Sequence, residues 1–388
     1  MCCRRKIAYT LGPMATKIRV GVLFGGKSAE HEVSLQSARN ILEAIDKEKY
    51  DVVLVGIDRD GRWLLNEGAA LLLPEGTGES LMPEEGERGA PVTLIPEGRG
   101  QLVRSSGLQP MGVLDVVFPV LHGPMGEDGT VQGLLKLADV PFVGADVLGS
   151  AVGMDKDVMK RLLRDAGVPS PRFLVCDRRG AAEIDFDAVR HELGSPVFVK
   201  PANMGSSVGV SKASDQAGLA SALAEALRYD HKVLIEELIA GREIECAVLG
   251  NEAPIASVPG EVLPKHDFYS YEAKYVDEEG ATLEIPAKLP EATVRAVQEM
   301  AIRAFQVLCC EGMARVDFFL LEDGRPLVNE INSIPGFTKI SMYPMLWEAS
   351  GISYTELIDR LIQLAIERHR RTRELETSYQ PGTALGDA

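Results

Sequence analysis

The most informative stretch of this chain for its architecture is "ARVDFFLLEDGRPLVNEIN", residues 314–332. Two apolar runs flank Asp323-Gly324, a dipeptide that strongly favours a tight turn between antiparallel strands. If these two residues form the whole loop, Glu322 pairs with Arg325, and the rest of the register follows from that pair. The stretch therefore predicts a β-hairpin with a two-residue loop.

This register places four polar side chains on one face of the hairpin. Asp317 faces Glu330, and Arg315 faces Asn332, because side chains alternate between the two faces with a period of two. Like charges directly opposite each other destabilise a strand pair. A set of carboxylate and amide oxygens that includes no Cys or His suits Mg²⁺ or Mn²⁺, and phosphate oxygens would complete the coordination shell of the ion. The alternative is a solvated hairpin face with an ordinary Arg–Asp ion pair.

A second stretch, "GVLFGGKSAEHEVSL" at residues 21–35, contains a match to the phosphate-loop pattern G-x-x-x-x-G-K-[ST]. Residues 22–24 are Val, Leu and Phe, which continue an apolar strand that begins near Ile18. The loop that remains, residues 25–28, is too short to surround a β-phosphate, so we reject a nucleotide site here. Two glycines at the end of a strand still permit close backbone approach, which predicts another kind of ligand site.

Around this turn the sequence predicts an open parallel α/β domain over residues 17–145. Strand, glycine turn, helix and strand follow one another between residues 18 and 57, as in a βαβ unit. Residues 66–110 are rich in Gly, Glu and Pro and are interpreted as an insertion with short edge strands. Ligands of such sheets bind beyond the carboxyl ends of the strands, where the Gly25-Gly26 and His122-Gly123 turns fall.

The rest of the chain mixes strands and helices in the α+β manner. We expect a central subdomain over residues 146–235 and a C-terminal subdomain over residues 236–372. Residues 1–16 and 373–388 are polar or lack an apolar pattern, so we expect disordered tails, or a start of translation at Met14.

The amino-acid composition argues against some classes of binding partner. Among 388 residues, 41 are Lys or Arg and 57 are Asp or Glu, for a formal charge of −16, which argues against nucleic acid or an anionic membrane as the main partner. No apolar run is long enough to span a bilayer, and the basic N-terminus lacks the apolar stretch of a signal peptide. The 6 cysteines have no metal-like spacing. We interpret them as reduced cysteines of a cytoplasmic protein.

Four other motifs point to a ligand. In "VFVKPANMGSSVGV" (197–210) a buried strand ends at a lysine and a glycine-rich hairpin follows, which suits phosphate. Acidic residues in "LIEELIAGREIEC" (234–246) could bind a purine and a ribose. The aromatic residues of "HDFYSYEAKY" (266–275) suit a lid, and "MDKDVM" (154–159) places a lysine in the first turn of a helix. The alternatives are, in order, a mobile hairpin, a linker strand, a packed aromatic cluster and a surface lysine.

The order of these motifs resembles the ATP-grasp superfamily, whose two α+β subdomains hold ATP between them. The stretches "LHGPMGEDGTVQG" (121–133) and "NEINSIPGFTKISMYP" (329–344), with the glycine turn and the lid, narrow the resemblance to the D-alanine–D-alanine ligase family. It covers residues 17–372. It implies an N-terminal α/β domain followed by a two-subdomain ATP-grasp module, in an enzyme of peptidoglycan precursor synthesis.

The resemblance also implies roles for individual residues. Glu30 and His122 match the site of the first D-alanine, and Ser341 matches the site of the second. Arg315 matches the arginine that stabilises the oxyanion, and Tyr275 with Ser206 and Glu30 orders the lid. The residues that match the ATP site are Lys156, Lys200, Ser206, Ser207, Glu236, Glu237, Ile239, Glu243 and Lys274. The residues that match the ligands of two Mg²⁺ or Mn²⁺ ions are Asp317, Glu330 and Asn332.

Two rival functions stay open at this point. A D-alanine–D-lactate ligase shares the fold and the first step, but such enzymes tend to lack the lid tyrosine that Tyr275 matches. A non-catalytic ATP-binding sensor would be favoured by loss of Arg315 or of a metal carboxylate, and all of these are present. The family resemblance further implies a homodimer.

Overall fold

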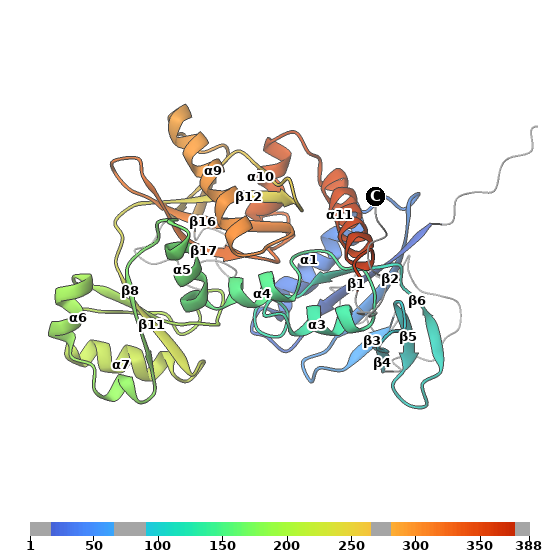
Figure 1. Ribbon diagram of the computed structural model, residues 1–388, viewed down its shortest axis with the longest axis horizontal. Coiled ribbons are helices and arrows are strands. Elements are labelled where there is room, and N and C mark those ends of the chain that lie inside the picture. Colours follow the sequence, from blue (N-terminus) through green and yellow to red (C-terminus); the bar gives the residue numbers. More distant parts are fainter. Residues whose placement is uncertain (1–16, 66–90, 265–280, 377–388) are drawn as a thin grey trace, which may run out of the picture.

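A computed structural model describes residues 17–65, 91–264 and 281–376 of the chain (Figure 1). Its N-terminal sheet is built on three parallel strands, β1 (Ile18–Gly25), β2 (Tyr50–Ile57) and β7 (Val116–Val120). Their order is β2-β1-β7, and β3 (Trp63–Leu65) adds to β2 in the antiparallel direction. Residues 22–24 lie within β1, as predicted, and so are not part of a phosphate-binding loop.

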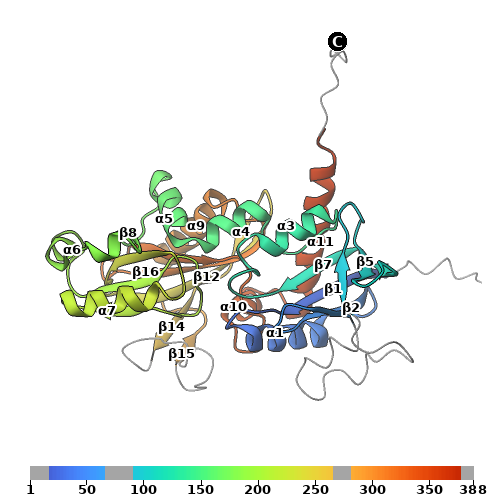
Figure 2. The same cartoon turned by 90° about the horizontal axis from the view of Figure 1, so that it is seen from below.

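Helices cover both faces of this sheet (Figure 2). Successive side chains of β1 point to opposite faces, so Val22 packs in the same cluster as α1 (His31–Ala44), and Leu23 packs with α3 (Thr130–Leu137). Among the described residues, no helix combines the length and the apolar character needed to cross a membrane.

The predicted insertion contains a small sheet. Strands β4 (Val92–Leu94), β5 (Gln101–Arg104) and β6 (Pro110–Val113) pair in this order, all antiparallel. Their apolar side chains, such as Leu102, join the cluster on the α3 face of the N-terminal sheet. The first part of the insertion, residues 66–90, lies outside the described residues.

The central part of the chain is an antiparallel sheet with helices on one face. The strand order is β10-β9-β11-β8, and the predicted strand that ends at Lys200 with the glycine-rich hairpin after it corresponds to β9, β10 and their connection. A buried apolar cluster joins this sheet to α6 and α7. The elements are β8 (Phe173–Asp177), η1 (Gly180–Ala182), α6 (Phe186–Leu193), β9 (Val197–Pro201), β10 (Ser211–Ala213), α7 (Gln216–Ala226) and β11 (Lys232–Glu237).

The C-terminal part is a larger antiparallel sheet in the order β15-β14-β12-β16-β17, with β13 paired to β12. Helix α9 covers one face of it and α10 lies on the other side, beside the N-terminal sheet. The elements are β12 (Arg242–Gly250), β13 (Ile255–Ala256), β14 (Gly260–Pro264), β15 (Ala281–Glu284), α9 (Glu291–Val307), β16 (Gly312–Leu320), β17 (Pro326–Asn332), α10 (Met342–Ala349) and α11 (Tyr354–Arg373).

The hairpin of β16 and β17 has the predicted site register but a different turn. Asp317 pairs with Glu330, and Arg315 pairs with Asn332. The predicted Glu322–Arg325 pair is wrong, because the amide of Leu321 donates to the carbonyl of Arg325 at 3.0 Å and leaves a three-residue loop. A β-bulge between Asp317 and Phe318 restores the register beyond it.

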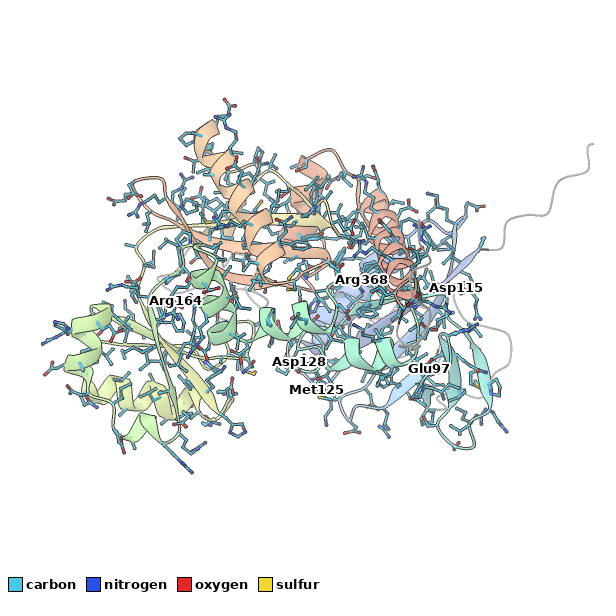
Figure 3. All side chains as sticks on the ribbon, viewed as in Figure 1. Glu97, Asp115, Met125, Asp128, Arg164 and Arg368 are labelled. Atoms are coloured by element: carbon cyan, nitrogen blue, oxygen red, sulfur yellow. The ribbon has the colours of Figure 1, made fainter. Side chains whose placement is uncertain are left out.

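The N-terminal sheet and the C-terminal part share one hydrophobic core. Phe337, which is fully buried, contacts Phe118 of β7 edge-to-face at a centroid distance of 5.7 Å. Helix α11 returns to this core, and its Arg368 (labelled in Figure 3) donates to the backbone carbonyls of Gly144 and Phe142. Two short helices, α4 (Val147–Met154) and α5 (Lys156–Asp165), lead from this body to the central sheet.

Candidate active site

The glycine turn after β1 brings backbone and side chains of two strand ends together. Gly25 has φ +92°, and a Cβ there would lie 2.2 Å from the carbonyl oxygen of Ile57, so only glycine fits. The hydroxyl of Ser34 in α1 accepts a hydrogen bond from the amide of Gly25 at 2.7 Å and donates to the carbonyl of Val120. The turn is thereby tied to the carboxyl end of β7, as expected for a site at this edge.

Glu30 lies directly before α1, at the N-cap position of this helix. It is buried, with 8% of its surface exposed. The hydroxyl of Ser206, from the hairpin between β9 and β10, donates to its Oε1, and the fold thus joins residues 176 positions apart. Gly123 has φ +74°, and a Cβ there would lie 2.6 Å from Glu30 Oε2, so a larger residue would be strained and would crowd this carboxylate. The predicted partners Glu30 and Ser206 are therefore in contact.

His122 is buried beside Glu30 at the end of β7. Its Nδ1 lies 3.0 Å from the carbonyl oxygen of Ile334, which identifies Nδ1 as the N–H that donates. Burial lowers the pKa of His122, and this outweighs the opposing effects of Glu30 and of the Ile334 carbonyl. The ring is therefore neutral, and its Nε2 has no hydrogen-bond partner among the described residues.

Glu127 is a site residue that the sequence did not single out. It is mostly buried, and its carboxylate accepts hydrogen bonds from the amides of Gly123 at 2.8 Å and Ile334 at 3.0 Å. Burial and the charge of Glu30 raise the pKa of Glu127 to about 8, against the effect of the two amides. The only signal was its place in "LHGPMGEDGTVQG", because Ile334 is distant in sequence.

The hairpin between β9 and β10 in the central part of the chain contacts the candidate site through Ser206. Ser206 and Ser207 have φ of +51° and +60°, a left-handed conformation that is uncommon outside glycine. Lys156, in the first turn of α5, donates to the carbonyl of Met204 in this hairpin at 2.8 Å. Its ammonium also lies 3.5 Å from Oε2 of Glu330, so it links the hairpin to the paired carboxylates of the C-terminal sheet.

Behind the hairpin lies a buried group of three charged residues that we call the lysine–glutamate triad: Lys160, Glu236 and Lys200. Glu236 Oε1 accepts from the ammonium of Lys200 at 2.7 Å, and its Oε2 lies 2.8 Å from the ammonium of Lys160. Burial alone would raise the pKa of Glu236, but the two lysines hold it below its usual value. Burial lowers the pKa of Lys160 to about 8. Lys160 was missed in the sequence, although it follows Lys156 by one helical turn.

The other residues matched to an ATP site lie around the junction after β11. The carboxylate of Glu237 accepts from the amide and the side chain of Arg172, both at 2.7 Å. Ile239 is partly buried just beyond β11. Glu243 lies on β12 between Val262 and Phe319 of the neighbouring strands. Lys274 and Tyr275 lie outside the described residues.

The hairpin of β16 and β17 brings the predicted metal residues together. Both oxygens of Asp317 accept from the guanidinium of Arg315 at 2.7 Å, and Oδ2 also accepts from the amide of Asn332 at 2.9 Å. Glu330 faces Asp317 across the strand pair. Glu245 of β12, which the sequence did not single out, lies opposite Asp317 and approaches Arg315 Nε at 2.9 Å.

Ser341, which matches the second-substrate site, lies at the start of α10. It occupies the N-cap position of α10, and its hydroxyl accepts from the amide of Thr338 at 2.9 Å. A Cβ on Gly336 would lie 2.7 Å from this hydroxyl, so a larger residue there would displace the Ser341 side chain. The N-terminus of a helix is suited to a carboxylate, because its amides and dipole favour negative charge.

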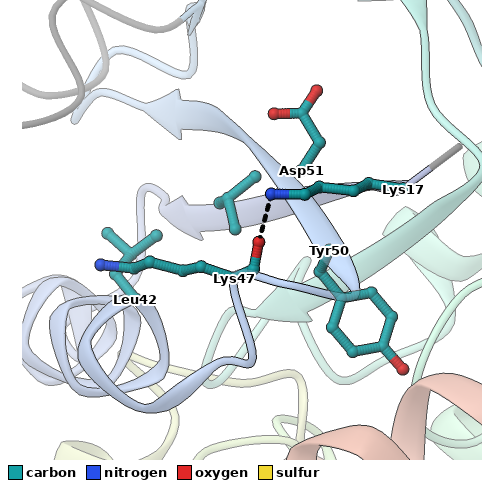
Figure 4. A pocket seen from close by; sticks show the side chains of 6 residues that line it. Lys17, Leu42, Lys47, Tyr50 and Asp51 are labelled. Carbon is teal, nitrogen blue, oxygen red and sulfur yellow. Dashed lines mark hydrogen bonds between the residues drawn. The ribbon is translucent and has the colours of Figure 1, made fainter. Parts of the chain in front are cut away.

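A pocket of about 180 Å³ lies far from this chemistry (Figure 4). It is lined by Lys17, Leu42, Lys47, Tyr50, Asp51 and Val52. These residues gather at the amino ends of β1 and β2, whereas ligands of parallel sheets bind at the carboxyl ends. The side chain of Lys17 donates to the carbonyl of Lys47 there at 2.6 Å. We assign no role to this pocket.

Comparison with known proteins agrees with the geometry. The family described as "D-ala D-ala ligase N-terminus" matches residues 19–145, and "D-ala D-ala ligase C-terminus" matches residues 162–363. The D-alanine–D-alanine ligase of Oceanobacillus iheyensis is 54% identical over 94% of this chain and 100% of its own length. That of Shouchella clausii is 56% identical over 93% of this chain and 98% of its own length.

Solved structures give the same family. The D-alanine–D-alanine ligase of Coxiella burnetii superposes with a TM-score of 0.82 at 40% identity and covers 93% of this chain and 97% of its own. The VanG D-Ala:D-Ser ligase of Enterococcus faecalis superposes with a TM-score of 0.80 at 34% identity, over 90% of this chain and 100% of its own. The predicted fold class and family are confirmed: the chain belongs to the D-alanine–D-alanine ligase family.

Proposed function

We propose that this enzyme joins two D-alanine molecules to D-alanyl-D-alanine, a peptidoglycan precursor, with ATP converted to ADP and phosphate. The observation that carries the proposal is the meeting of two half-sites. Glu30 at the glycine turn contacts Ser206 of the central hairpin, and Lys156 ties that hairpin to Glu330 of the C-terminal sheet. A carboxylate for an ammonium group and lysines for phosphates thus converge on one space.

The first D-alanine would bind at the N-terminal half-site. The buried carboxylate of Glu30 is suited to the ammonium group, and the neutral ring of His122 presents Nε2 as an acceptor beside it. Residues 17–145 would therefore carry the first-substrate site, and residues 146–235 and 236–372 would hold ATP between them. Lys156 and Lys200 would contact the phosphates as cationic donors.

The donors on β16 and β17 fit a hard divalent cation. Asp317, Glu330 and Asn332 offer oxygen only, which suits Mg²⁺ or Mn²⁺ better than zinc. No cluster of three His, Cys, Asp or Glu residues shaped for a metal occurs in the described part of the chain. Mg²⁺ commonly uses one or two carboxylates and completes its shell with substrate phosphates. We infer that these three residues hold two such ions, which would neutralise charge on the transferring phosphoryl group.

The chemistry then follows in two steps. A carboxylate oxygen of the first D-alanine attacks the γ-phosphorus of ATP, the bond to the bridging oxygen breaks, and ADP leaves. The deprotonated amine of the second D-alanine attacks the carbonyl carbon of the acyl phosphate, and phosphate leaves. Arg315, held by Asp317 and Glu245, would stabilise the tetrahedral oxyanion. The second carboxylate would bind near Ser341 at the start of α10.

Product identity tests this proposal. Purified protein is incubated with ATP, Mg²⁺, D-alanine and excess D-lactate or D-serine, at neutral and mildly acidic pH, and products are read by mass. D-alanyl-D-alanine with ADP and phosphate is expected. Predominant D-alanyl-D-lactate would keep the site but overturn the proposed second substrate. ATP binding without any ADP release would favour the sensor. We also propose a homodimer in the cytoplasm, where ATP is available; analytical ultracentrifugation tests the dimer.

A further inference from the structure

The lysine–glutamate triad brings together side chains from two strands and one helix. Lys200 and Glu236 lie on neighbouring antiparallel strands, β9 and β11, two positions apart along the pairing. Lys160 reaches the same carboxylate from α5 and is fully buried, with 0% of its side chain exposed. Its ammonium also lies 5.9 Å from the centre of the Phe173 ring. Lys160 therefore sits behind Glu236, where it is enclosed by protein.

The charge of the triad is unbalanced. Two ammonium groups share a single carboxylate, so a net positive charge remains in a region where ions are costly to bury. An apolar residue in place of Lys160 would usually serve stability as well or better. In the triad, however, Lys160 occupies Oε2 of Glu236, which leaves Oε1 to orient Lys200. A buried positive surplus beside the hairpin is the complement of a triphosphate.

We propose that Lys160 is a positioning residue for nucleotide binding, which holds Glu236 in place and so keeps the Lys200 ammonium directed at the phosphates of ATP. This inference rests on the proposed function, since it assumes that ATP occupies the space beside Lys200. Lys160 itself does not touch the nucleotide, because Glu236 stands between them.

The first test replaces Lys160 with an uncharged residue of similar length. Lys160→Met should raise the Kd for ATP, measured by titration calorimetry with Mg²⁺, by on the order of tenfold, the effect of one hydrogen bond to a charged group. The KM for D-alanine should stay within about twofold, because Glu30 and His122 are untouched. Arg164→Met is the matched control: Arg164 is exposed one turn further along α5 (Figure 3), and its loss should leave both constants unchanged. A wild-type Kd for ATP in Lys160→Met would overturn the proposal.

A double-mutant cycle tests whether Lys160 acts through Glu236. Glu236→Gln alone should also weaken ATP binding. If Lys160 works by holding this carboxylate, adding Lys160→Met to Glu236→Gln should change the Kd for ATP by less than about twofold. Fully additive effects would mean that Lys160 acts on the nucleotide by another route, and the proposal would fail.

A third measurement keeps the test decisive if Lys160→Met does not fold. The charged groups that face Lys160 are Glu236 of β11, Lys200 of β9 and Glu330 of β17. Burial and the charge of Lys200 lower the pKa of Lys160, the two carboxylates raise it, and the resulting pKa is about 8. In the wild type, ATP affinity should therefore fall as pH rises through this range, as Lys160 loses its proton. Lys160→Arg keeps its charge and should lose less affinity above pH 8. Identical pH profiles would contradict the proposal.

Loss of ligation and loss of ATP binding are separable outcomes. Binding of ATP is measured without D-alanine, so it judges Lys160 even if no ligation occurs. A wild-type protein that binds ATP but makes no dipeptide would refute the proposed function only. A wild-type protein that binds no ATP would refute both.

Discussion

At the residue scale, the paired carboxylates of the hairpin are the most consequential feature. Glu330 faces Asp317 across two strands and lies 3.5 Å from the ammonium of Lys156. In the proposed site, the first arrangement would offer oxygen ligands to a cation, and the second would hold a lysine near the phosphates of ATP. Removing a single carboxylate should therefore affect the chemistry much more than the fold.

Glu330→Gln should lower kcat by on the order of a hundredfold, since a catalytic metal supplies several kcal/mol of charge stabilisation. The Mg²⁺ concentration needed for half-maximal rate should rise, while the melting temperature changes little. Glu322→Gln, an exposed residue in the loop of the same hairpin, is the control and should behave as the wild type. An unchanged Mg²⁺ dependence in Glu330→Gln would show that the register does not build a metal site.

Glu127 should give the stability of the protein a distinct pH dependence. The pKa of Glu127 is raised from the ordinary value of 4.5 to about 8. Between these two pH values the folded state therefore holds a proton that the unfolded state has lost. Its contribution to stability is therefore complete below about pH 4.5 and is lost as pH rises through about 8.

Glu127→Gln cannot titrate, so it removes this slope. Relative to the wild type, the variant should be less stable at pH 5, where it lacks one acceptor for two amides, and the gap should narrow or reverse by pH 8.5. Urea unfolding across this range is the measurement. Glu348→Gln, an exposed position on α10, is the matched control. Parallel stability curves for wild type and Glu127→Gln would refute the assignment.

At the element scale, the hairpin of β16 and β17 shows how a turn and a bulge compensate each other. The loop has three residues, with Gly324 at φ +82° in the left-handed region. That shifts the register by one residue relative to a two-residue loop. The bulge beside Asp317 shifts it back, so the functional pairs still face each other. The strands thus meet in the register that the polar side chains require, whatever the turn.

Replacing Gly324 tests the conformation of this loop. Gly324→Ala should lower the free energy of unfolding by about 1 kcal/mol, because alanine resists a positive φ. Space is not the cause, since the nearest atom to a Cβ there is Thr293 Oγ1 at 3.7 Å. Gly133→Ala, in the middle of α3 with nothing within 4 Å, should instead stabilise by about 0.5–1 kcal/mol. Chemical denaturation compares them, and equal signs would contradict the loop conformation.

At the scale of the whole molecule, α11 holds the N-terminal sheet to the C-terminal part. Its apolar face enters the core that also contains α1 and Phe337. Its Arg368 is buried and bonds two backbone carbonyls of residues 142 and 144, with its guanidinium 4.5 Å from the ring centre of Phe142. The residues proposed to bind the first substrate and those proposed to bind metal therefore belong to parts of the chain that share this core.

Arg368→Met should destabilise the protein by about 2–4 kcal/mol, because two buried carbonyls lose their donor. Thermal and urea unfolding followed by circular dichroism measure this loss. Arg360→Met, half exposed on the same helix and paired with Glu356, should change stability by less than about 0.5 kcal/mol. If the two variants were equally stable, the contacts between α11 and the loop that follows α3 would not contribute to folding.

Much of the architecture was predictable from local patterns. The spacing of apolar residues and the glycines at the end of the first strand predicted β1, α1 and the parallel α/β unit. Such patterns are readable because the residues that form them lie close together along the chain. The same holds for the polar face of β16 and β17. Helices α4, α6 and α10 were not predicted; each has only eight residues, too few for a clear periodic signal.

By itself, the sequence determined most of the secondary elements, the fold class, the polar face of the hairpin and the residue types that a phosphoryl-transfer site needs. Only the tertiary structure brings residues that are distant along the chain into contact. The contact of Ser206 with Glu30 spans 176 positions and that of Glu127 with Ile334 spans 207. The approach of Lys160 to Glu236 likewise requires α5 to pack on the central sheet. Periodicity reports only on neighbours along the chain, whereas desolvation, shared hydrogen bonds and pKa shifts arise from neighbours in space.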